Sequence, residues 1–238
     1  MRTDRTVVES WEAEYRSGRY VREPPVDFVQ DILAAARRYG LARGLYVGCG
    51  NGRNFVPLVE GGLDLEGLDV SPTAIRQLAQ RLPSREGRLR VGDLADLPSD
   101  ATFPIVIGIQ VFQHGDRSTC QENVRAAQRH LAPRGLFCLR VNAIGGVLEH
   151  RAELVESAPD GSETVRYVDG PKRGLRIHFF SRPEIEELFD GEYSAVLPLR
   201  LQCLPREPPG RGFWCQWEAI WQRSSDVREA GGSRPPSP

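Results

Sequence analysis

Three glycines at alternate positions, directly after an apolar run, restrict the fold of this chain more than any other feature. The run 45–47 leads into Gly48, Gly50 and Gly52 and then into sequence that can start a helix. Glycine permits a tight turn and a close ligand, and the helix N-terminus offers free N–H groups to polar ligand atoms. The pattern predicts a strand, a nucleotide-cofactor loop and a helix. A dinucleotide loop has a third glycine three residues after the second, but this chain has Arg53 there, which argues against a nicotinamide cofactor.

A second apolar run ends in a carboxylate about twenty residues after the loop, a spacing at which α/β folds bind a ribose diol. The run Leu65–Asp69 places Asp69 at that position. An ionised carboxylate can accept hydrogen bonds from both hydroxyls of a diol. Asp69 is therefore the predicted ribose-binding residue.

Predicted strands and helices alternate along the first 141 residues. Apolar residues recur at helical spacing in 29–36, 75–82 and 116–131, and Ser71 is a predicted helix cap. The run 105–109 is apolar throughout, as expected of a central strand that is buried on both faces. Regular alternation of this kind predicts a parallel sheet.

In this order the motifs resemble those of class I S-adenosylmethionine-dependent methyltransferases. The glycine loop resembles the first family motif, Asp69 the second-strand acid, and Gly92–Pro98 the segment that holds the adenine. Phe103–His114 resembles the fourth strand with its exit loop, and Leu131–Leu136 the turn into the fifth strand. The resemblance implies an α/β, Rossmann-like fold with a seven-stranded, mostly parallel sheet, helices on both faces and an antiparallel last strand. It also implies S-adenosylmethionine as the cofactor.

A narrower similarity points to small-molecule enzymes of the tellurite- and thiopurine-methyltransferase kind. It rests on Gly52–Asn54, on Gly67–Ile75, and on the early Trp11 and Tyr15. It implies transfer of a methyl group to a small-molecule acceptor by direct displacement. One departure is Tyr46, which stands where the family usually has an acidic residue that contacts the amino acid end of the cofactor.

The resemblance also assigns the cofactor contacts. Asp93 is expected to accept a hydrogen bond from the adenine amino group, although an aspartate after a strand can instead cap a turn. Cys49 has no histidine near it in sequence and is not expected to be a nucleophile. The predicted cofactor-binding residues are Tyr15, Gly48, Cys49, Gly50, Asn54, Asp69, Val70, Asp93, Leu94 and Gln110.

Methyl transfer from a sulfonium requires the protein chiefly to align donor and acceptor and to exclude water. An acidic thiol or a similar soft atom needs positioning only, whereas a hydroxyl or ammonium acceptor needs a base. His114 follows the fourth strand, where such sheets present ligands, and is the predicted catalytic base. A packed loop histidine is the other interpretation.

Two segments are predicted to cover the site. Residues 1–40 form N-terminal helices and a lid, although a simply packed helix fits equally well. Residues 143–180 are too long for an ordinary loop and are predicted to be a substrate-side insertion containing a hairpin. Tyr20 and His178 are the predicted substrate-binding residues, with His178 facing away from the apolar side chains beside it.

Residues 1–222 are predicted to form one domain, since its size is sufficient for a core, and residues 223–238 a disordered tail. The 31 basic residues include one lysine, and the formal net charge is -1 without any block of like charges. Binding to nucleic acid or to an anionic membrane is therefore not expected.

The five cysteines show no disulfide or zinc spacing, so we expect reduced thiols, no metal and a cytoplasmic location. The expected partner is a small-molecule substrate, and the sequence does not define an oligomeric state. Two alternatives stay open. One is a nucleotide-dependent oxidoreductase of related fold, and the other is a non-catalytic S-adenosylmethionine-binding partner or sensor protein, for which Tyr46 is the hint.

Overall fold

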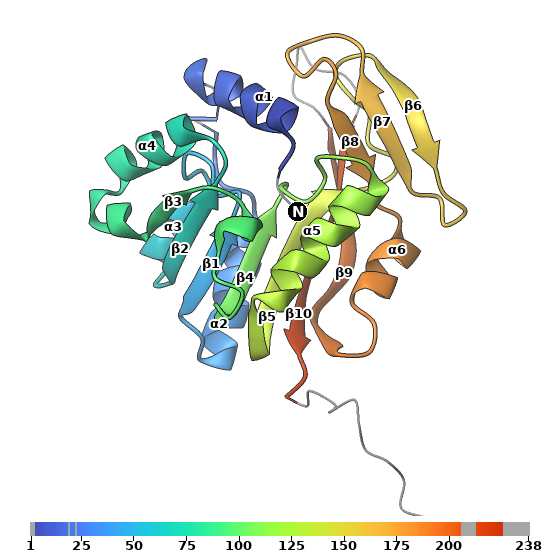
Figure 1. Cartoon of the computed structure of the whole chain (residues 1–238). Coiled ribbons are helices and arrows are strands. Elements are labelled where there is room, and N and C mark those ends of the chain that lie inside the picture. The colour runs from blue at the N-terminus through green and yellow to red at the C-terminus, as the bar shows by residue number, and fades with distance from the viewer. Residues whose placement is uncertain (1–2, 19, 22, 206–212, 226–238) are drawn as a thin grey trace, which may run out of the picture.

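The computed structural model describes residues 3–18, 20–21, 23–205 and 213–225. Figure 1 shows a central sheet with a smaller sheet beside its upper edge. The helices are α1 (Arg5–Arg16), α2 (Phe28–Tyr39), α3 (Phe55–Glu60), α4 (Pro72–Arg81), α5 (Arg117–Arg129) and α6 (Arg182–Leu188), with 3-10 turns at Pro83–Arg88 and Leu94–Asp96. The strands are β1 (Arg43–Val47), β2 (Asp64–Asp69), β3 (Leu89–Val91), β4 (Phe103–Ile109), β5 (Leu131–Asn142), β6 (Ala152–Ser157), β7 (Glu163–Tyr167), β8 (Arg176–Phe179), β9 (Tyr193–Pro205) and β10 (Phe213–Arg223).

The central sheet has seven strands in the order β3-β2-β1-β4-β5-β10-β9. Its first five strands are mutually parallel, and β10 runs antiparallel to both β5 and β9. The predicted Rossmann-like sheet with an antiparallel strand at its end is therefore confirmed.

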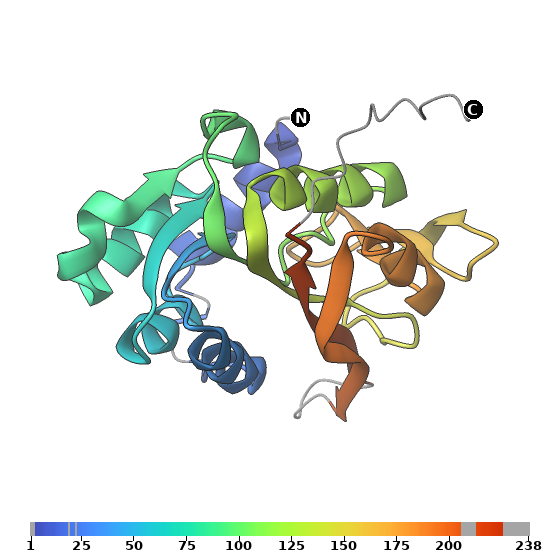
Figure 2. The ribbon, with the colours of Figure 1, turned by 90° about the horizontal axis from the view of Figure 1, so that it is seen from below.

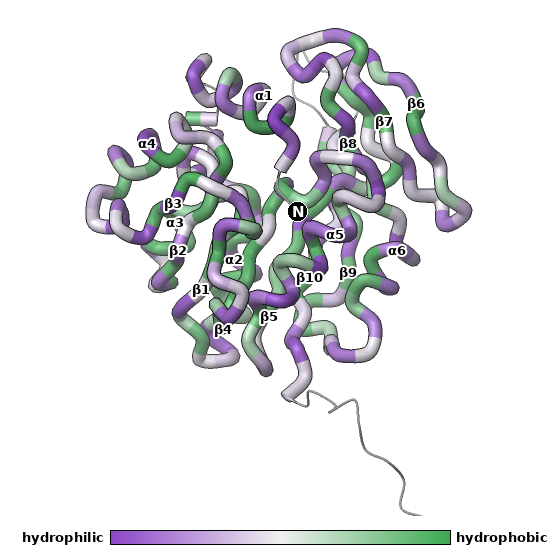
Figure 3. The backbone as a smooth tube through the Cα atoms, in the orientation of Figure 1, coloured by the Kyte–Doolittle hydropathy of each residue, from purple (hydrophilic) through white to green (hydrophobic). Residues whose placement is uncertain are grey.

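Helices cover both faces of this sheet. Seen from below, α2 lies on one side and α5 on the other (Figure 2). Each face has its own apolar cluster, one with Phe28 and Ile32 of α2 and one with Cys120 and Val124 of α5. The chain is mostly apolar along the central strands and alternates along the outer helices (Figure 3), as expected when strands are buried on both faces.

Serine side chains cap two of the helices, and the cap at Ser71 is predicted from the sequence. Ser71 accepts a hydrogen bond from the N–H of Ala74 at the start of α4, at 3.1 Å. Ser181 does the same for Glu184 at the start of α6, at 3.2 Å. These caps fix where each helix leaves the carboxyl edge of the sheet. No helix in the described ranges is long and apolar enough to cross a membrane.

The insertion forms a separate sheet in the order β6-β7-β8. The predicted hairpin is present as β7 and β8, which pair antiparallel. The third strand, β6, was not predicted because its side chains are mostly exposed and give no apolar alternation. Isolated bridges between His114 and Ile177 and between Ala143 and Phe180 attach this sheet to the main one.

His178 lies at the junction between the insertion and helices α5 and α6. Its Nδ1 is 2.9 Å from the hydroxyl of Thr164, and its Nε2 is 2.9 Å from Oε2 of Glu184. Glu184 also accepts hydrogen bonds from Arg117 at 3.1 Å and from Gln121 at 2.8 Å. The predicted orientation of His178 is wrong: its side chain is fully buried, because α5 and α6 cover the face of β8 that the alternation pattern left exposed.

The cysteine prediction is also wrong for two of the five residues. Cys203 and Cys215 are direct cross-strand neighbours on β9 and β10 and form a disulfide bond. Cys49, Cys120 and Cys138 are free and buried. The pairing depends on the register of the two strands, which spacing in the sequence does not reveal. Residues 226–238, most of the predicted tail, lie outside the described part of the chain.

We expect Glu184→Gln to lower the free energy of unfolding at pH 7 by about 1–3 kcal/mol, since a buried charged acceptor of three hydrogen bonds is lost. Burial opposes ionisation, but hydrogen bonds from His178, Gln121 and Arg117 and the charge of His178 keep the pKa of Glu184 below its ordinary 4.5. This stabilisation is present above about pH 4.5 and disappears as the pH falls. Urea unfolding at pH 7 and pH 3.5 measures both effects.

The matched control is Glu186→Gln on the same helix. Its carboxylate is exposed and, among the described residues, pairs with Arg182 one turn earlier. Its unfolding free energy should change by less than about 0.5 kcal/mol. Equal stability of the two variants at pH 7 would contradict a structural role for Glu184 at this junction.

Candidate active site

The glycine loop between β1 and α3 has the backbone that the sequence predicts. Gly48, Gly50 and Gly52 have φ angles of 67°, 55° and 93°, a region that favours glycine. A Cβ on Gly50 would lie 2.5 Å from the hydroxyl oxygen of Tyr15. Glycine at position 50 therefore allows both the turn and the contact with α1.

Asp69 at the end of β2 connects this loop to the next helix. Its Oδ2 accepts a hydrogen bond from the N–H of Gly50 at 2.8 Å, and its Oδ1 accepts one from Ser71 at 2.9 Å. Burial raises the pKa of Asp69 to about 6, against the opposing effect of these two hydrogen bonds. Each carboxylate oxygen can accept a further hydrogen bond, so the group can bind a diol while it holds the loop.

Helix α1 lies over the loop and is attached to the N-terminus of α4. The carboxylate of Glu12 accepts hydrogen bonds from the hydroxyls of Ser71 at 2.5 Å and Thr73 at 2.6 Å and from the N–H of Thr73 at 3.1 Å. Burial raises the pKa of Glu12, but these hydrogen bonds and the charge of Arg16 outweigh it and lower the pKa to about 2. The sequence analysis did not identify this attachment, because Glu12 and Ser71 are 59 residues apart.

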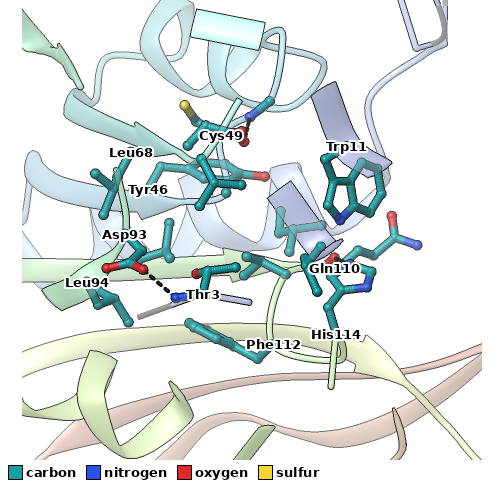
Figure 4. A pocket seen from close by; sticks show the side chains of 18 of the residues that line it. Thr3, Trp11, Tyr46, Cys49, Leu68, Asp93, Leu94, Gln110, Phe112 and His114 are labelled. Carbon is teal, nitrogen blue, oxygen red and sulfur yellow. Dashed lines mark hydrogen bonds between the residues drawn. The ribbon is translucent and has the colours of Figure 1, made fainter. Parts of the chain in front are cut away.

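A cavity of about 180 Å³ lies at the carboxyl edge of the sheet, between the glycine loop and α1. Figure 4 shows Asp93 and Leu94 at one end of it and Trp11, Gln110 and His114 at the other. The structure brings together all ten residues predicted to bind the cofactor, since each of them lines this cavity: Tyr15, Gly48, Cys49, Gly50, Asn54, Asp69, Val70, Asp93, Leu94 and Gln110. Thr3, Val7, Val111 and Phe112 also line it and were not predicted.

Asp93 both caps a turn and accepts a hydrogen bond from the start of the chain. Its Oδ1 accepts from the N–H of Ala95 at 2.9 Å, and its Oδ2 from the N–H of Thr3 at 2.6 Å (Figure 4). The turn-capping interpretation of Asp93 is therefore confirmed, and the adenine contact stays a prediction. In this structure the backbone of Thr3 supplies the kind of donor that the resemblance assigns to an adenine amino group.

Gln110 directly follows β4 and has an unusual backbone. Its φ angle is 57°, in the left-handed region that non-glycine residues rarely adopt. The conformation is held by a 2.7 Å hydrogen bond from its N–H to the carbonyl of Arg140, and its own carbonyl lies 3.2 Å from Nε2 of His114. Strained backbone of this kind is concentrated at functional sites.

These contacts define the proton position on His114. A carbonyl oxygen can only accept, so Nε2 carries the hydrogen and Nδ1 keeps its lone pair. Nδ1 is buried and has no hydrogen-bond partner among the described residues. Burial and the positive charge of Lys172 lower the pKa of His114 to about 3, so the imidazole is neutral at physiological pH. The ring of Trp11 packs edge-on, with 5.0 Å between ring centroids.

A second cavity, of about 620 Å³, adjoins the first. The two share Trp11, Tyr20, Arg53, Gln110 and His114. The rest of its wall comes from residues 23–27, from β5 and the loop after β4, from the insertion, and from β9 and β10. The last two regions contribute Tyr167, Phe179, Phe213, Trp214 and Gln216. The predicted substrate residues thus separate: Tyr20 lines both cavities, whereas His178 lines neither.

Most residues of the second cavity were not identified from the sequence. Gln113, Asn142 and Gln216 lie at or near the ends of β4, β5 and β10, and they meet only when those strands pair. Their predicted position at the carboxyl edge of the sheet was the sequence feature that could have indicated a ligand-binding role, since parallel sheets bind ligands at that edge.

The structure is an α/β fold with two adjoining cavities. Residues 45–135 match the family model described as a methyltransferase domain. This match and the strand order support the resemblance to class I S-adenosylmethionine-dependent methyltransferases. A search of curated proteins finds no relative by sequence.

Solved structures of methyltransferases share the fold at low sequence identity. The 1,6-didemethyltoxoflavin N1-methyltransferase of Burkholderia thailandensis, with bound 1,6-didemethyltoxoflavin and S-adenosylhomocysteine, is 19% identical over 92% of this chain and 88% of that chain, with a TM-score of 0.62. The magnesium protoporphyrin IX methyltransferase of Synechocystis PCC 6803, with bound S-adenosylmethionine, is 15% identical over 93% and 98%, with a TM-score of 0.62. CalS10, an amino pentose methyltransferase of Micromonospora echinaspora, is 22% identical over 90% and 96%, with a TM-score of 0.56.

We expect Glu12→Ala to loosen α1 from α4 without unfolding the domain. Charge-assisted hydrogen bonds contribute about 1.5–3 kcal/mol each, so amide hydrogen exchange in residues 5–16 should become at least about tenfold faster. Glu9→Ala is the matched control, since Glu9 lies on the same helix and pairs only with the exposed Arg5. Equal exchange rates in the two variants would show that Glu12 does not hold the helix.

Proposed function

We propose that this chain transfers a methyl group from S-adenosylmethionine to a small-molecule acceptor by direct displacement. The observation that supports this most is the pair of adjoining cavities, which meet at Gln110 and His114. The first is lined by the motif residues of the family, and the second is enclosed by chain segments outside the motifs. Two neighbouring sites suit a reaction whose main requirement is alignment of donor and acceptor.

The motif residues supply the contacts for the cofactor. Asp69 would bind the ribose hydroxyls, and Asp93 would accept from the adenine amino group at the opposite end from His114. Gln110 and the glycine loop would flank the amino acid end and the methyl group. When bound there, S-adenosylmethionine supplies an electrophilic methyl group on a positively charged sulfur.

His114 would bind the acceptor through the lone pair on Nδ1. A neutral imidazole with a pKa of about 3 is a weak base, so it serves better to orient an N–H or O–H group than to remove its proton. The catalytic role of His114 is therefore proposed as alignment by a hydrogen bond. Trp11 and Tyr20 would exclude water from the junction of the two cavities.

The cofactor assignment is tested by calorimetric titration with S-adenosylhomocysteine, with NAD as a comparison ligand. We expect binding of S-adenosylhomocysteine only, and at least about tenfold weaker binding to Asp69→Asn, because an amide provides one acceptor oxygen where the carboxylate provides two. Asp64→Asn is the matched control, since Asp64 begins the same strand and pairs with Arg85 away from the cavity. Unchanged affinity in a folded Asp69→Asn protein would refute the ribose role.

A second substitution tests the role of Asp93. Thr3→Pro removes the N–H that donates to Asp93 Oδ2. If the adenine amino group uses that oxygen, affinity for S-adenosylhomocysteine should increase several-fold, because a competing donor is gone. Thr3→Ala keeps the N–H and should bind like the unmodified protein. Weaker binding to Thr3→Pro would instead make Thr3 part of the cofactor site.

A further inference from the structure

Buried polar atoms without partners identify what the second cavity binds. In the described part of the chain, three buried side-chain atoms have no hydrogen-bond partner: Ser10 Oγ, His114 Nδ1 and Gln216 Oε1. Two of them, on His114 and Gln216, belong to residues that line the second cavity. Such atoms are uncommon in folded proteins and usually bind water or a ligand.

Gln216 is oriented by a row of amides that crosses from β10 to β5 and to the loop after β4. Its Nε2 donates to Oδ1 of Asn142 at 2.6 Å, and the N–H of Asn142 donates to Oε1 of Gln113 at 2.7 Å. The residue is only 1% exposed, so its side chain is held in place by packing. The row engages the amide nitrogen of Gln216 and leaves its carbonyl oxygen as an acceptor.

His114 presents an acceptor of the same kind where this cavity adjoins the cofactor site. Its Nε2 hydrogen is directed to the carbonyl of Gln110, which leaves Nδ1 to accept. A ligand that forms a hydrogen bond with each of these two acceptor atoms must therefore have two hydrogen-bond donors.

Aromatic side chains form part of the wall of the second cavity, and its two arginines have partners. Tyr167, Phe179 and Trp214 line the cavity, which favours a flat aromatic ligand. Arg140 pairs with Glu218 at 2.7 Å, and Arg53 pairs with Glu23 at 2.8 Å. These pairs balance the arginine charge, so the acceptor class is inferred from the hydrogen bonds and the aromatic packing.

We propose that the methyl acceptor is an aromatic molecule with at least two hydrogen-bond donors, one bound by His114 Nδ1 and the other by Gln216 Oε1. This inference rests on the proposed function and specifies its substrate class. The oxygen or nitrogen at His114 uses a lone pair to form the new bond to the methyl carbon as the carbon–sulfur bond of the cofactor breaks. The methylated atom is cationic and acidic, so its proton passes along the hydrogen bond to Nδ1 of His114 and reaches solvent when the product leaves. The second donor stays bound to Gln216.

Dihydroxynaphthalenes are suitable probes, because their isomers present two hydroxyl donors at different separations. The 1,3-, 1,5-, 2,6- and 2,7-isomers and their dimethyl ethers are titrated into the full chain by calorimetry, with and without S-adenosylhomocysteine. We expect at least one diol to bind about tenfold or more tightly than its own ether, since the ether has no donor for either acceptor.

Gln216→Met and Gln202→Met then test the assigned atom. Both residues line the cavity and face each other across β9 and β10, but of the two only Gln216 has a buried side-chain oxygen without a partner. Gln216→Met should reduce the preference for the diol about tenfold, and Gln202→Met should keep it. His114→Phe should reduce it as well, and thermal unfolding confirms that each variant is folded.

Equal binding of every diol and its ether to the unmodified protein would overturn the inference, and this comparison does not depend on any variant. A preference that survives in both Gln216→Met and His114→Phe would also overturn it. The titration with S-adenosylhomocysteine alone separates the two proposals. Failure of that titration removes the proposed function, whereas cofactor binding without a diol preference removes only the acceptor class.

Discussion

The carboxylate of Asp69 is the contact on which the arrangement of the cofactor site depends. It accepts backbone hydrogen bonds from Gly50 in the glycine loop and from Ser71 at the start of α4, so it fixes two turns that leave neighbouring strands. The hydroxyl of Ser71 then donates to Glu12 and attaches α1 over the loop. Loop, helix cap and lid are therefore joined through three side chains. Loss of the central carboxylate would affect geometry as well as ligand contacts.

The sequence was sufficient to predict the sheet and the cofactor side of the site, because both depend on local patterns. Alternating apolar runs and helical periodicity specify a parallel sheet, and the residues at strand ends meet at its carboxyl edge. Gly48, Asp69, Asp93 and Gln110 all occupy such positions, and all line one cavity. These residues are far apart in the sequence, but each belongs to one strand and the turn after it. The parallel sheet brings these turns together, so each position could be predicted from its own local pattern.

The sequence was not sufficient where the structure depends on register or on a second packed face. Cys203 and Cys215 pair because β9 and β10 align them, and an offset of one residue would separate them. His178 alternates with apolar residues as an exposed side chain would, yet α5 and α6 bury it against Glu184. The second cavity could not be predicted for both reasons, strand register and packing of separate segments. Its wall contains residues of the N-terminal segment, the insertion and the last two strands.

The acceptor side is nevertheless connected to the motif residues by a continuous series of contacts. The imidazole of His114 is held by the carbonyl of Gln110, and the strained backbone of Gln110 is held by the carbonyl of Arg140 on β5. Arg140 forms a buried ion pair with Glu218, two residues from Gln216 on β10. Both unpaired acceptors are therefore positioned by contacts from β4, β5 and β10, which belong to the same sheet as the strands that position the glycine loop. Because those strands pack on both faces, the spacing between the acceptors is set by the sheet, and the lid and the insertion contribute the walls around it.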